Sequence, residues 1–556
     1  MVIIGKFAYL KTVKRQFLTH QSALHSLHHR TVPTVRGDIL SRNGMPLAVS
    51  APMYNVIFDP KIMHKYATKA QLKALTQLPA IDLSYLQLKK LFKAYPYSQY
   101  YLARKAITPA ASAPIKSLKI PGITLKLNWR RFYPLSNAAA QLVGFTNIHG
   151  QGQDGLELSY DQQLMHYNGQ ETVLTNAKGQ TLKVLHVEQK PRAGRDITLS
   201  IDSRIQNFVY SALKTEVKKS HAISGSAVVL DPRTGEILAT GSYPSFNPNS
   251  FSGRVGPQVR ARALTDMFEP GSVMKVLTVA AALESGKYTP KSVVNTSPGY
   301  YYINGNRIRD DADFGVITMT GVITKSSNVG ISKIALTLNR QKVYNMFVKA
   351  GVGSKPSGIF PGEASGILHP FNTMGEFEFA TMTFGYAITV SLVQLARIYG
   401  AIANQGVLEP ISFLKIKKPP PGRRLMSPKT ARTLMNILHT VVGPGGTGLM
   451  ANVPGFCVAG KTGTTHQVGP QGFYKHRYNA VFVGMIPCSH PKLVIAVRMN
   501  DPTGMYNEFG GVSAAPVFAQ VAQKSLLALG IKPDRPHINH KLFSHEKNFA
   551  SMIAGA

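Results

Sequence analysis

Alternating and helical patterns of apolar residues predict an α+β chain. Alternation over residues 196–202 predicts a strand, and the amphipathic stretch 203–219 predicts a helix directly after it. Two apolar runs then flank a Pro/Gly turn within residues 225–240, a pattern typical of a hairpin. A new domain is therefore expected to begin near residue 196. Later patterns within it are two strands and a helix, at 480–487, 493–500 and 514–529.

The residues before this domain follow a different pattern. The stretch 36–50 reads as a strand, an Asn43-Gly44 turn and a second strand. Beyond it, short helical patterns such as 69–93 alternate with turn-rich stretches. We interpret residues 31–195 as an extended α+β module without evident catalytic chemistry.

The two ends of the chain are polar. Residues 1–30 are basic and rich in histidine, with apolar residues at helical spacing, and residues 536–556 form a polar tail. His25, His28 and His29 have the spacing of metal ligands on a helix, but no carboxylate or cysteine accompanies them. They indicate either a metal site or a polar, solvated helix face.

The charge balance implies an anionic partner or surroundings. Lysine and arginine number 63 against 27 aspartates and glutamates, which gives a formal net charge of +36. Nucleic acid, anionic lipid headgroups and an anionic wall polymer would all fit. No zinc-finger spacing, basic zipper or RNA-binding signature accompanies the charge, so it selects none of them. No apolar run approaches the length that spans a bilayer.

Only two cysteines occur, Cys457 and Cys488, so the chain is not a disulfide-stapled scaffold. Both lie in apolar segments that flank one loop. An in-register hairpin would set them opposite each other and allow a disulfide between them. Two buried, inert thiols are the alternative.

A candidate nucleophile lies where a strong helical pattern begins. Pro270 and Gly271 precede Ser272, and apolar residues then recur at helical spacing until Gly286. Ser272 and Lys275 share one helix face, so a neutral lysine amine could take the proton of the serine hydroxyl. The helix N-terminus would add N–H groups that favour an oxyanion. A serine N-cap followed by a solvated lysine would give the same motif.

Two later stretches add residues of related chemistry. A polar break containing Ser326 and Asn328 interrupts a helical pattern over residues 318–338, and it predicts either an ordinary helix–helix turn or a hydroxyl and an amide presented to a cleft. A lysine and hydroxyls at the end of a buried strand could hold a carboxylate. These residues are Lys461, Thr462, Gly463 and Thr464.

The segment 455–462 also fits a different motif. It satisfies G-x-x-x-x-G-K-[ST], the phosphate loop of nucleotide hydrolases. Such a loop follows a strand and opens a helix, whereas here the intervening residues are themselves strand-like and Gly463 interrupts any helix from Lys461. The context favours a ligand-binding strand.

In chain order, S-x-x-K at Ser272, S-x-N at Ser326 and K-T-G at Lys461 form the signature of penicillin-binding proteins and class A β-lactamases. On these motifs the sequence resembles the class B penicillin-binding proteins, specifically the septal peptidoglycan D,D-transpeptidases of bacterial cell division. The resemblance runs from about residue 10 to about residue 530. It includes Arg36-Gly37-Asp38-Ile39 with Arg42-Asn43-Gly44, Arg262 to Asp266 with Phe268 to Gly271, Asn500-Asp501-Pro502 and Gly510 to Pro516.

The resemblance implies a penicillin-binding transpeptidase fold over residues 196–535, an antiparallel sheet with helices on both faces. An elongated α+β pedestal of the dimerisation type would precede it over residues 31–195. Ser272 would attack the carbonyl between the two terminal D-alanines of a stem peptide, with Lys275 as its base. The acyl-enzyme would then pass to an amine of a neighbouring stem peptide.

The other matched residues have implied roles around this serine. Ser326 and Asn328 would relay protons and bind the donor peptide. The backbone N–H groups of Ser272 and Thr464 would form the oxyanion hole. The donor's carboxylate and backbone would be held by Lys461, Thr462 and Gly463. No metal or organic cofactor is implied.

The implied partners are stem peptides, β-lactams that acylate the same serine, a glycan polymerase and other membrane proteins of the division complex, with no nucleic acid. The implied location is the periplasmic face of the bacterial inner membrane at the division site. The family's N-terminal membrane anchor is not visible in this sequence, which begins where that anchor would end.

Related activities remain as alternatives. A D,D-carboxypeptidase or an elongation-type transpeptidase would share the motifs, although the residues before Ser272 favour the division branch. A β-lactamase usually needs a carboxylate that hydrolyses its acyl-enzyme, and no E-x-x-x-N-like loop occurs between Asn328 and Lys461. A non-catalytic wall-binding scaffold should have lost a catalytic residue, and none is lost.

Overall fold

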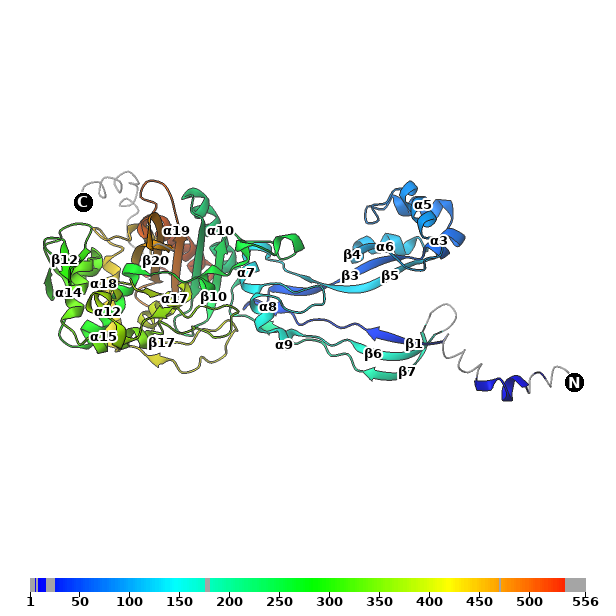
Figure 1. The fold of residues 1–556 in the computed structure, drawn as a ribbon, viewed down its shortest axis with the longest axis horizontal. Helices are drawn as coiled ribbons and strands as arrows, with labels where there is room; N and C mark the ends of the chain where they lie inside the picture. Colours follow the sequence, from blue (N-terminus) through cyan, green and yellow to red (C-terminus); the bar gives the residue numbers. More distant parts are fainter. Residues whose placement is uncertain (1–5, 7–8, 17–25, 176–180, 470–471, 536–556) are drawn as a thin grey trace.

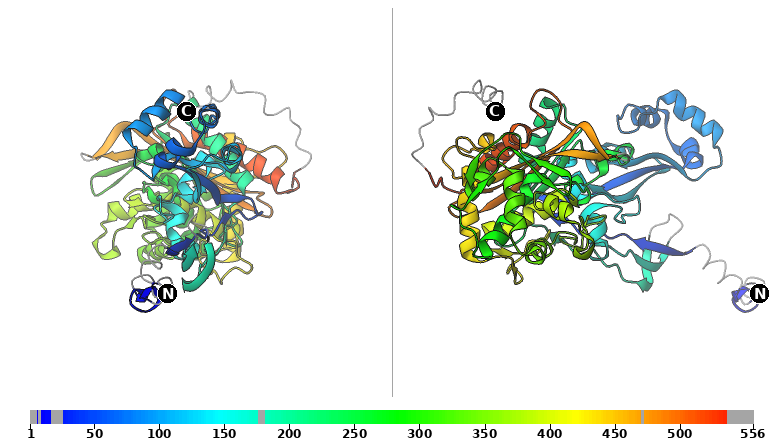
Figure 2. Two further views of the ribbon diagram at one scale, coloured as in Figure 1. Left: turned by 90° about the vertical axis from the view of Figure 1, so that its right-hand side faces the viewer. Right: turned by 60° about the vertical axis from the view of Figure 1, so that its left-hand side comes forward.

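The computed structural model describes residues 6, 9–16, 26–175, 181–469 and 472–535. The molecule is long, with a helix-rich domain at one end and two arms of strands that extend away from it (Figure 1). The arms stay apart in the turned views of Figure 2. The predicted α+β class, with an elongated module before the larger domain, is confirmed.

Two sheets form the arms of the N-terminal module. The smaller joins β1 (Leu27–Val32), β6 (Gly169–Thr175) and β7 (Thr181–Gln189) in antiparallel order. The larger has the order β4-β3-β2-β8, with β5 also paired to β3. Its strands are β2 (Ile39–Leu40), β3 (Pro46–Phe58), β4 (Tyr101–Ile107), β5 (Ile123–Phe132) and β8 (Ile197–Thr198). The predicted strand–turn–strand over residues 36–50 corresponds to β2 and the start of β3.

Strand β1 corrects the helical spacing predicted for the histidines at the end of the first segment. His28 and His29 lie on β1 and face Val173 and Thr172 of β6. This pairing with a distant strand overrides the local helical spacing, so the prediction of one helix face was wrong. His25 lies outside the described residues.

A helical lobe covers the end of the arm that β3, β4 and β5 form, which is the longer of the two arms. Four helices pack there on β3, β4 and β5 around a core that includes Val56, Phe58, Met63, Leu88 and Phe92. Each helix begins at a side chain that accepts from the first turn: Asp59, Thr68, Ser84 and Thr108. The helices are α3 (Pro60–Tyr66), α4 (Lys69–Thr76), α5 (Tyr85–Ala94) and α6 (Pro109–Ser117).

The larger domain is built on a five-stranded antiparallel sheet of order β10-β9-β21-β20-β19. Alternation divides its residues between two cores: Val228 and Ala496 face one side, and Ala227 and Val497 the other. The strands are β9 (Ser224–Leu230), β10 (Ile237–Tyr243), β19 (Ala459–Gly469), β20 (Gly472–Ile486) and β21 (Leu493–Asn500).

Helices cover both faces of this sheet. The first core contains α12 (Lys275–Glu284), α17 (Leu392–Ala403) and α18 (Pro428–Thr440). The second contains α10 (Ser203–Lys219) and α19 (Gly510–Ala528). The predicted helix at 203–219 and strand at 493–500 are confirmed as α10 and β21.

Shorter elements surround the first core. Four two-stranded sheets pair β11 (Val293–Asn295) with β14 (Val316–Thr318), β12 (Tyr300–Ile303) with β13 (Asn306–Arg309), β15 (Ile367–Leu368) with β16 (Ile388–Thr389), and β17 (Val407–Leu408) with β18 (Arg423–Arg424). The helices are α11 (Arg262–Thr265), the 3-10 turn η4 (Gly271–Met274), α13 (Met319–Thr324), α14 (Asn328–Leu336), α15 (Arg340–Ala350) and α16 (Glu376–Met382). Three further short helices, α7 (Ala140–Val143), α8 (Gly155–Ser159) and α9 (Asp161–Leu164), lie in the N-terminal module.

Cys457 and Cys488 form a disulfide, with their Cα atoms 5.1 Å apart. The bond joins the segments just outside the paired ends of β19 and β20. Of the two alternatives for these cysteines, the structure contains the disulfide. Among the described residues, no helix combines the length and apolarity needed to cross a membrane.

Candidate active site

Residues from the three predicted motifs meet at one point. Lys275 opens α12, Ser326 lies in the turn between α13 and α14, and Lys461 lies on β19. The Lys275 amine donates to the Ser326 carbonyl, and its Nζ lies 3.2 Å from Ser326 Oγ. Lys461 Nζ lies 2.9 Å from the same hydroxyl. Residues almost 190 positions apart are therefore connected through one serine side chain.

The turn that carries Ser272 packs directly along β19. Thr465 Oγ1 donates to the Glu269 carbonyl over 2.9 Å. Gly271 has φ +61°, and a Cβ there would lie 2.5 Å from Thr465 Cγ2. A Cβ at Gly463 would lie 2.8 Å from the Pro270 carbonyl oxygen. Glycine at 271 and 463 allows this close approach, because a side chain at either position would separate the turn from the strand.

Ser272 itself is half-buried at the start of the helix, one turn before Lys275. Within the described part of the chain its hydroxyl has no hydrogen-bond partner, so no hydrogen bond joins it to Lys275. Catalytic hydrogen bonds often form only once substrate is bound. The hydroxyl thus lies one helical turn before Lys275 and, among the described residues, is not held by another group.

Both lysines are completely buried. Burial lowers the pKa of Lys275 to about 7, against the opposing charges of Asp310 and Asp311. Burial, together with the nearby charge of Lys275, lowers the pKa of Lys461 as well. Two positive charges that lie close together and away from solvent raise the free energy of the doubly protonated pair. Around neutral pH the pair therefore tends to release one proton.

The turn between α13 and α14 is held in an uncommon conformation. Ser326 has φ +64°, in the left-handed region that residues other than glycine rarely adopt. Ser327 caps α14 by accepting from the Gly330 N–H over 2.8 Å. This geometry directs the Ser326 carbonyl and hydroxyl together toward the Lys275 amine.

Asp310 is a functional candidate that the sequence reasoning missed. Its carboxylate accepts from the Ser327 hydroxyl and from the backbone N–H groups of Asn328 and Val329. It therefore fixes the start of α14 and the S-x-N turn. Only an Arg-Asp-Asp run marked it in the sequence, since its partners lie 17 to 19 residues further along the chain.

The remaining predicted residues lie around this centre. Asn328 is half-buried and its amide donates to the Arg309 carbonyl over 3.0 Å. Thr462 Oγ1 lies 2.6 Å from Thr447 Oγ1, a neighbour the sequence did not indicate. Thr464 Oγ1 accepts from the Gly510 N–H over 3.2 Å.

Strand β19 settles the rival reading of the K-T-G segment. The sequence had indicated that Lys461 lies at the end of a strand. The strand instead begins at Ala459, so Lys461 lies near its start. Lys461 pairs with Val483 of β20, and the strand continues to Gly469 without a helix. The phosphate-loop geometry is therefore absent from this segment.

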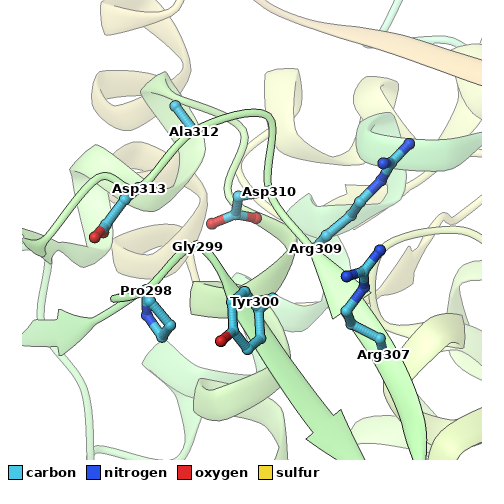
Figure 3. Close-up of a pocket in the computed structure, with 8 residues that line it drawn as sticks. All are labelled: Pro298, Gly299, Tyr300, Arg307, Arg309, Asp310, Ala312 and Asp313. Carbon is cyan, nitrogen blue, oxygen red and sulfur yellow. The ribbon is translucent and has the colours of Figure 1, made fainter.

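Figure 3 shows a cavity of about 270 Å³ whose lining includes Asp310, the residue that holds the S-x-N turn. It shares Asp310 with the site, and its lining includes none of the catalytic candidates. Two aspartates and two arginines make the lining polar. The residues are Pro298, Gly299, Tyr300, Arg307, Arg309, Asp310, Ala312 and Asp313.

Comparison with known proteins assigns the family. Residues 225–523 match the penicillin-binding protein transpeptidase domain, and residues 31–199 match the penicillin-binding protein dimerisation domain. Together with the fold and the three converging motifs, these matches show that the chain belongs to the penicillin-binding proteins.

The relatives lie in the class B branch of that family. The chain is 38% identical to the probable peptidoglycan D,D-transpeptidase PbpC of Pseudomonas aeruginosa, over 96% of this chain and 94% of that protein. It is also 38% identical to the peptidoglycan D,D-transpeptidase FtsI of Escherichia coli K12, over 96% and 90%.

Solved structures agree with this assignment. The transpeptidase domain of Burkholderia pseudomallei penicillin-binding protein 3 is 43% identical, with a TM-score of 0.56, over 61% of this chain and 98% of that one. Penicillin-binding protein 3 of Mycobacterium tuberculosis, solved with aztreonam, is 27% identical, with a TM-score of 0.70, over 91% and 99%.

Proposed function

We propose that this protein is a septal peptidoglycan D,D-transpeptidase that cross-links stem peptides through an acyl-enzyme on Ser272. The observation that carries the proposal is the pair of buried lysines that meet at Ser326, with Lys275 one helical turn after Ser272, whose hydroxyl has no partner among the described residues. Its relatives named as peptidoglycan D,D-transpeptidases support the substrate class.

In the first half-reaction, Ser272 Oγ attacks the carbonyl carbon between the two terminal D-alanines. Lys275 accepts the hydroxyl proton, because burial lowers its pKa to about 7 and so leaves a substantial fraction of its amine neutral near pH 7. The C–N bond then breaks, and the proton passes through Ser326 to the departing amine of the last D-alanine. The backbone N–H groups of Ser272 and Thr464 stabilise the oxyanion.

Donor binding settles which lysine carries the charge. A terminal carboxylate placed against Lys461 favours the protonated form of that amine. The positive charge on Lys461 then helps to keep Lys275 neutral, since the two amines share Ser326. Thr462 and Gly463 bind the carboxylate and the peptide backbone, and Asn328 holds the donor amide.

In the second half-reaction, an amine of a neighbouring stem peptide attacks the acyl carbon and releases Ser272. Water in place of that amine would make the protein a carboxypeptidase. β-Lactams acylate the same serine. No metal or organic cofactor enters either step.

The proposed setting is the division site, at the periplasmic face of the bacterial inner membrane. There the protein would work with a glycan polymerase and other membrane proteins of the division complex. The similarity to FtsI supports the division role over an elongation role.

The direct test is to incubate the protein with a lipid-linked substrate and a glycan polymerase, and to measure product masses. Cross-linked peptides that disappear in Ser272→Ala are expected. Free D-alanine without cross-links would instead show a carboxypeptidase.

A further inference from the structure

A strongly basic lobe forms the tip of the longer arm. Residues 59–120 contain ten lysines and one arginine but only two aspartates. Asp59 caps α3, and Asp82 pairs with Arg104. All ten lysines are exposed, and in the described part of the chain none of them forms a salt bridge. The lobe therefore presents an uncompensated positive surface.

Two amphipathic helices of this lobe mix charge with apolar groups on their outer sides. Helix α3 buries Met63 and presents Lys61, Ile62, Lys65 and Tyr66. Helix α5 buries Leu88, Leu91 and Phe92 and presents Leu86, Lys89, Lys90 and Lys93. Leu86 and Tyr66 remain 63% and 59% exposed. The two helices are in contact, and the His64 and Phe92 rings pack edge to face across them.

A tyrosine-rich turn extends the same surface. Tyr95, Tyr97 and Tyr100 follow α5, and Tyr97 and Tyr100 are 85% and 62% exposed. The Lys61 N–H donates to the Ser98 carbonyl over 3.2 Å, which holds this turn against the start of α3. We call the outer sides of α3 and α5, together with the turn 95–100, the α3–α5 face.

We propose that the α3–α5 face docks on the surface of a bilayer that contains anionic lipid. Lysines near such a surface are each attracted by the negative charge of the headgroups. Tyrosine rings and lysine stems suit the boundary between headgroups and acyl chains, where a ring has an apolar body and a polar tip. A soluble polyanion would use the lysines but would leave the tyrosines in water.

The position of the lobe gives this contact a consequence. The lobe lies at the end of the long axis opposite the larger domain (Figure 1). Docking there directs the domain that carries Ser272 away from the lipid surface. This inference does not depend on the proposed reaction.

The test is flotation of the full chain with vesicles of phosphatidylcholine alone or with 30% phosphatidylglycerol. Binding to the anionic vesicles that weakens with salt is expected. The variant Lys89→Glu/Lys90→Glu/Lys93→Glu should lower partitioning by at least about 100-fold. The variant Tyr97→Ser/Tyr100→Ser leaves the net charge unchanged and should lower it several-fold.

A matched control changes the same charge elsewhere. Lys342, Lys349 and Lys355 are exposed lysines of the larger domain, and their triple substitution by glutamate should leave partitioning within a few-fold of the parent. An equal loss in the control would show that binding follows total charge and would overturn the proposal. Unchanged binding of the tyrosine variant would show a plain polyanion site and would overturn it too. Labelling of Ser272 by a fluorescent penicillin confirms that each variant is folded.

Discussion

At the scale of single residues, Ser326 accounts for how one serine hydroxyl can be activated at neutral pH. Its Oγ accepts from both Lys275 and Lys461, so these two buried amines lie against one small group. Desolvation disfavours charge on each amine, and the nearby charge of one disfavours charge on the other. We propose that the pair in this way supplies both a base and a cation to the reaction.

The pH dependence of acylation follows from this arrangement. A base acts only when it is neutral, and the pKa of Lys275 is lowered to about 7. The rate at which a penicillin acylates Ser272 should therefore fall about tenfold per pH unit below pH 7 and level off above it. Stopped-flow measurement from pH 5 to pH 9 checks this. A rate that stays flat from pH 5 to pH 8 would exclude Lys275 as the base, and Lys275→Arg should be slower by about 10²- to 10⁴-fold.

At the scale of elements, the serine turn depends on how closely η4 approaches β19. Contact at Gly463 holds the turn close to the strand, and we propose that the N–H groups of Ser272 and Thr464 there serve one oxyanion. The disulfide of Cys457 and Cys488 closes the segments beside the paired ends of β19 and β20, and so supports the same strand pair.

Gly463→Ala tests the close approach. The new Cβ would meet the Pro270 carbonyl oxygen at 2.8 Å, so the turn must move by several tenths of an ångström. We expect acylation of the folded protein to slow by about 10- to 100-fold, because small misplacements of reacting groups are costly. Gly375→Ala is the matched control, since its Cβ would meet nothing within 4 Å. Equal acylation rates in the two variants would contradict the role given to this contact.

Sequence patterns predicted the elements whose structure depends on local periodicity. Helix α10 and strand β21 have the predicted bounds, and the three motifs lie on the surfaces that meet. Long-range pairing was not predictable: β1 joins β6, and Asp310 caps a helix that begins at Asn328. The start of β19 was misplaced because glycines on both sides of Lys461 obscured the strand pattern.

At the scale of the whole molecule, a buried ion-pair cluster lies where the arms of the N-terminal module join. Glu157 is fully buried, and its two carboxylate oxygens accept from Arg36 Nε and Arg131 Nε, each over 2.7 Å. Arg36 also donates to Asp161 over 2.6 Å. Residues from three distant parts of the chain thus meet in one network, far from the lysine pair in sequence.

Glu157→Gln tests whether this network holds the module together. The change removes the buried anion that Arg36 and Arg131 share and leaves Arg36 with Asp161 alone, which should lower the free energy of unfolding of the module by about 3–5 kcal/mol. Asp82→Asn removes the exposed partner of Arg104 and should cost less than about 1 kcal/mol. Urea unfolding measures both, and equal losses would contradict the role of Glu157. Acylation of Ser272 in the folded variants should remain at the parent rate.

The most direct test of the account is covalent labelling with a fluorescent penicillin. The parent chain and Ser285→Ala, which changes an exposed serine at the end of the same helix, should both become labelled. Their intact masses should rise by the mass of the β-lactam. Ser272→Ala should remain unlabelled, because the nucleophile is gone. Labelling of Ser272→Ala equal to that of the parent would contradict the assignment of Ser272 and the mechanism built on it.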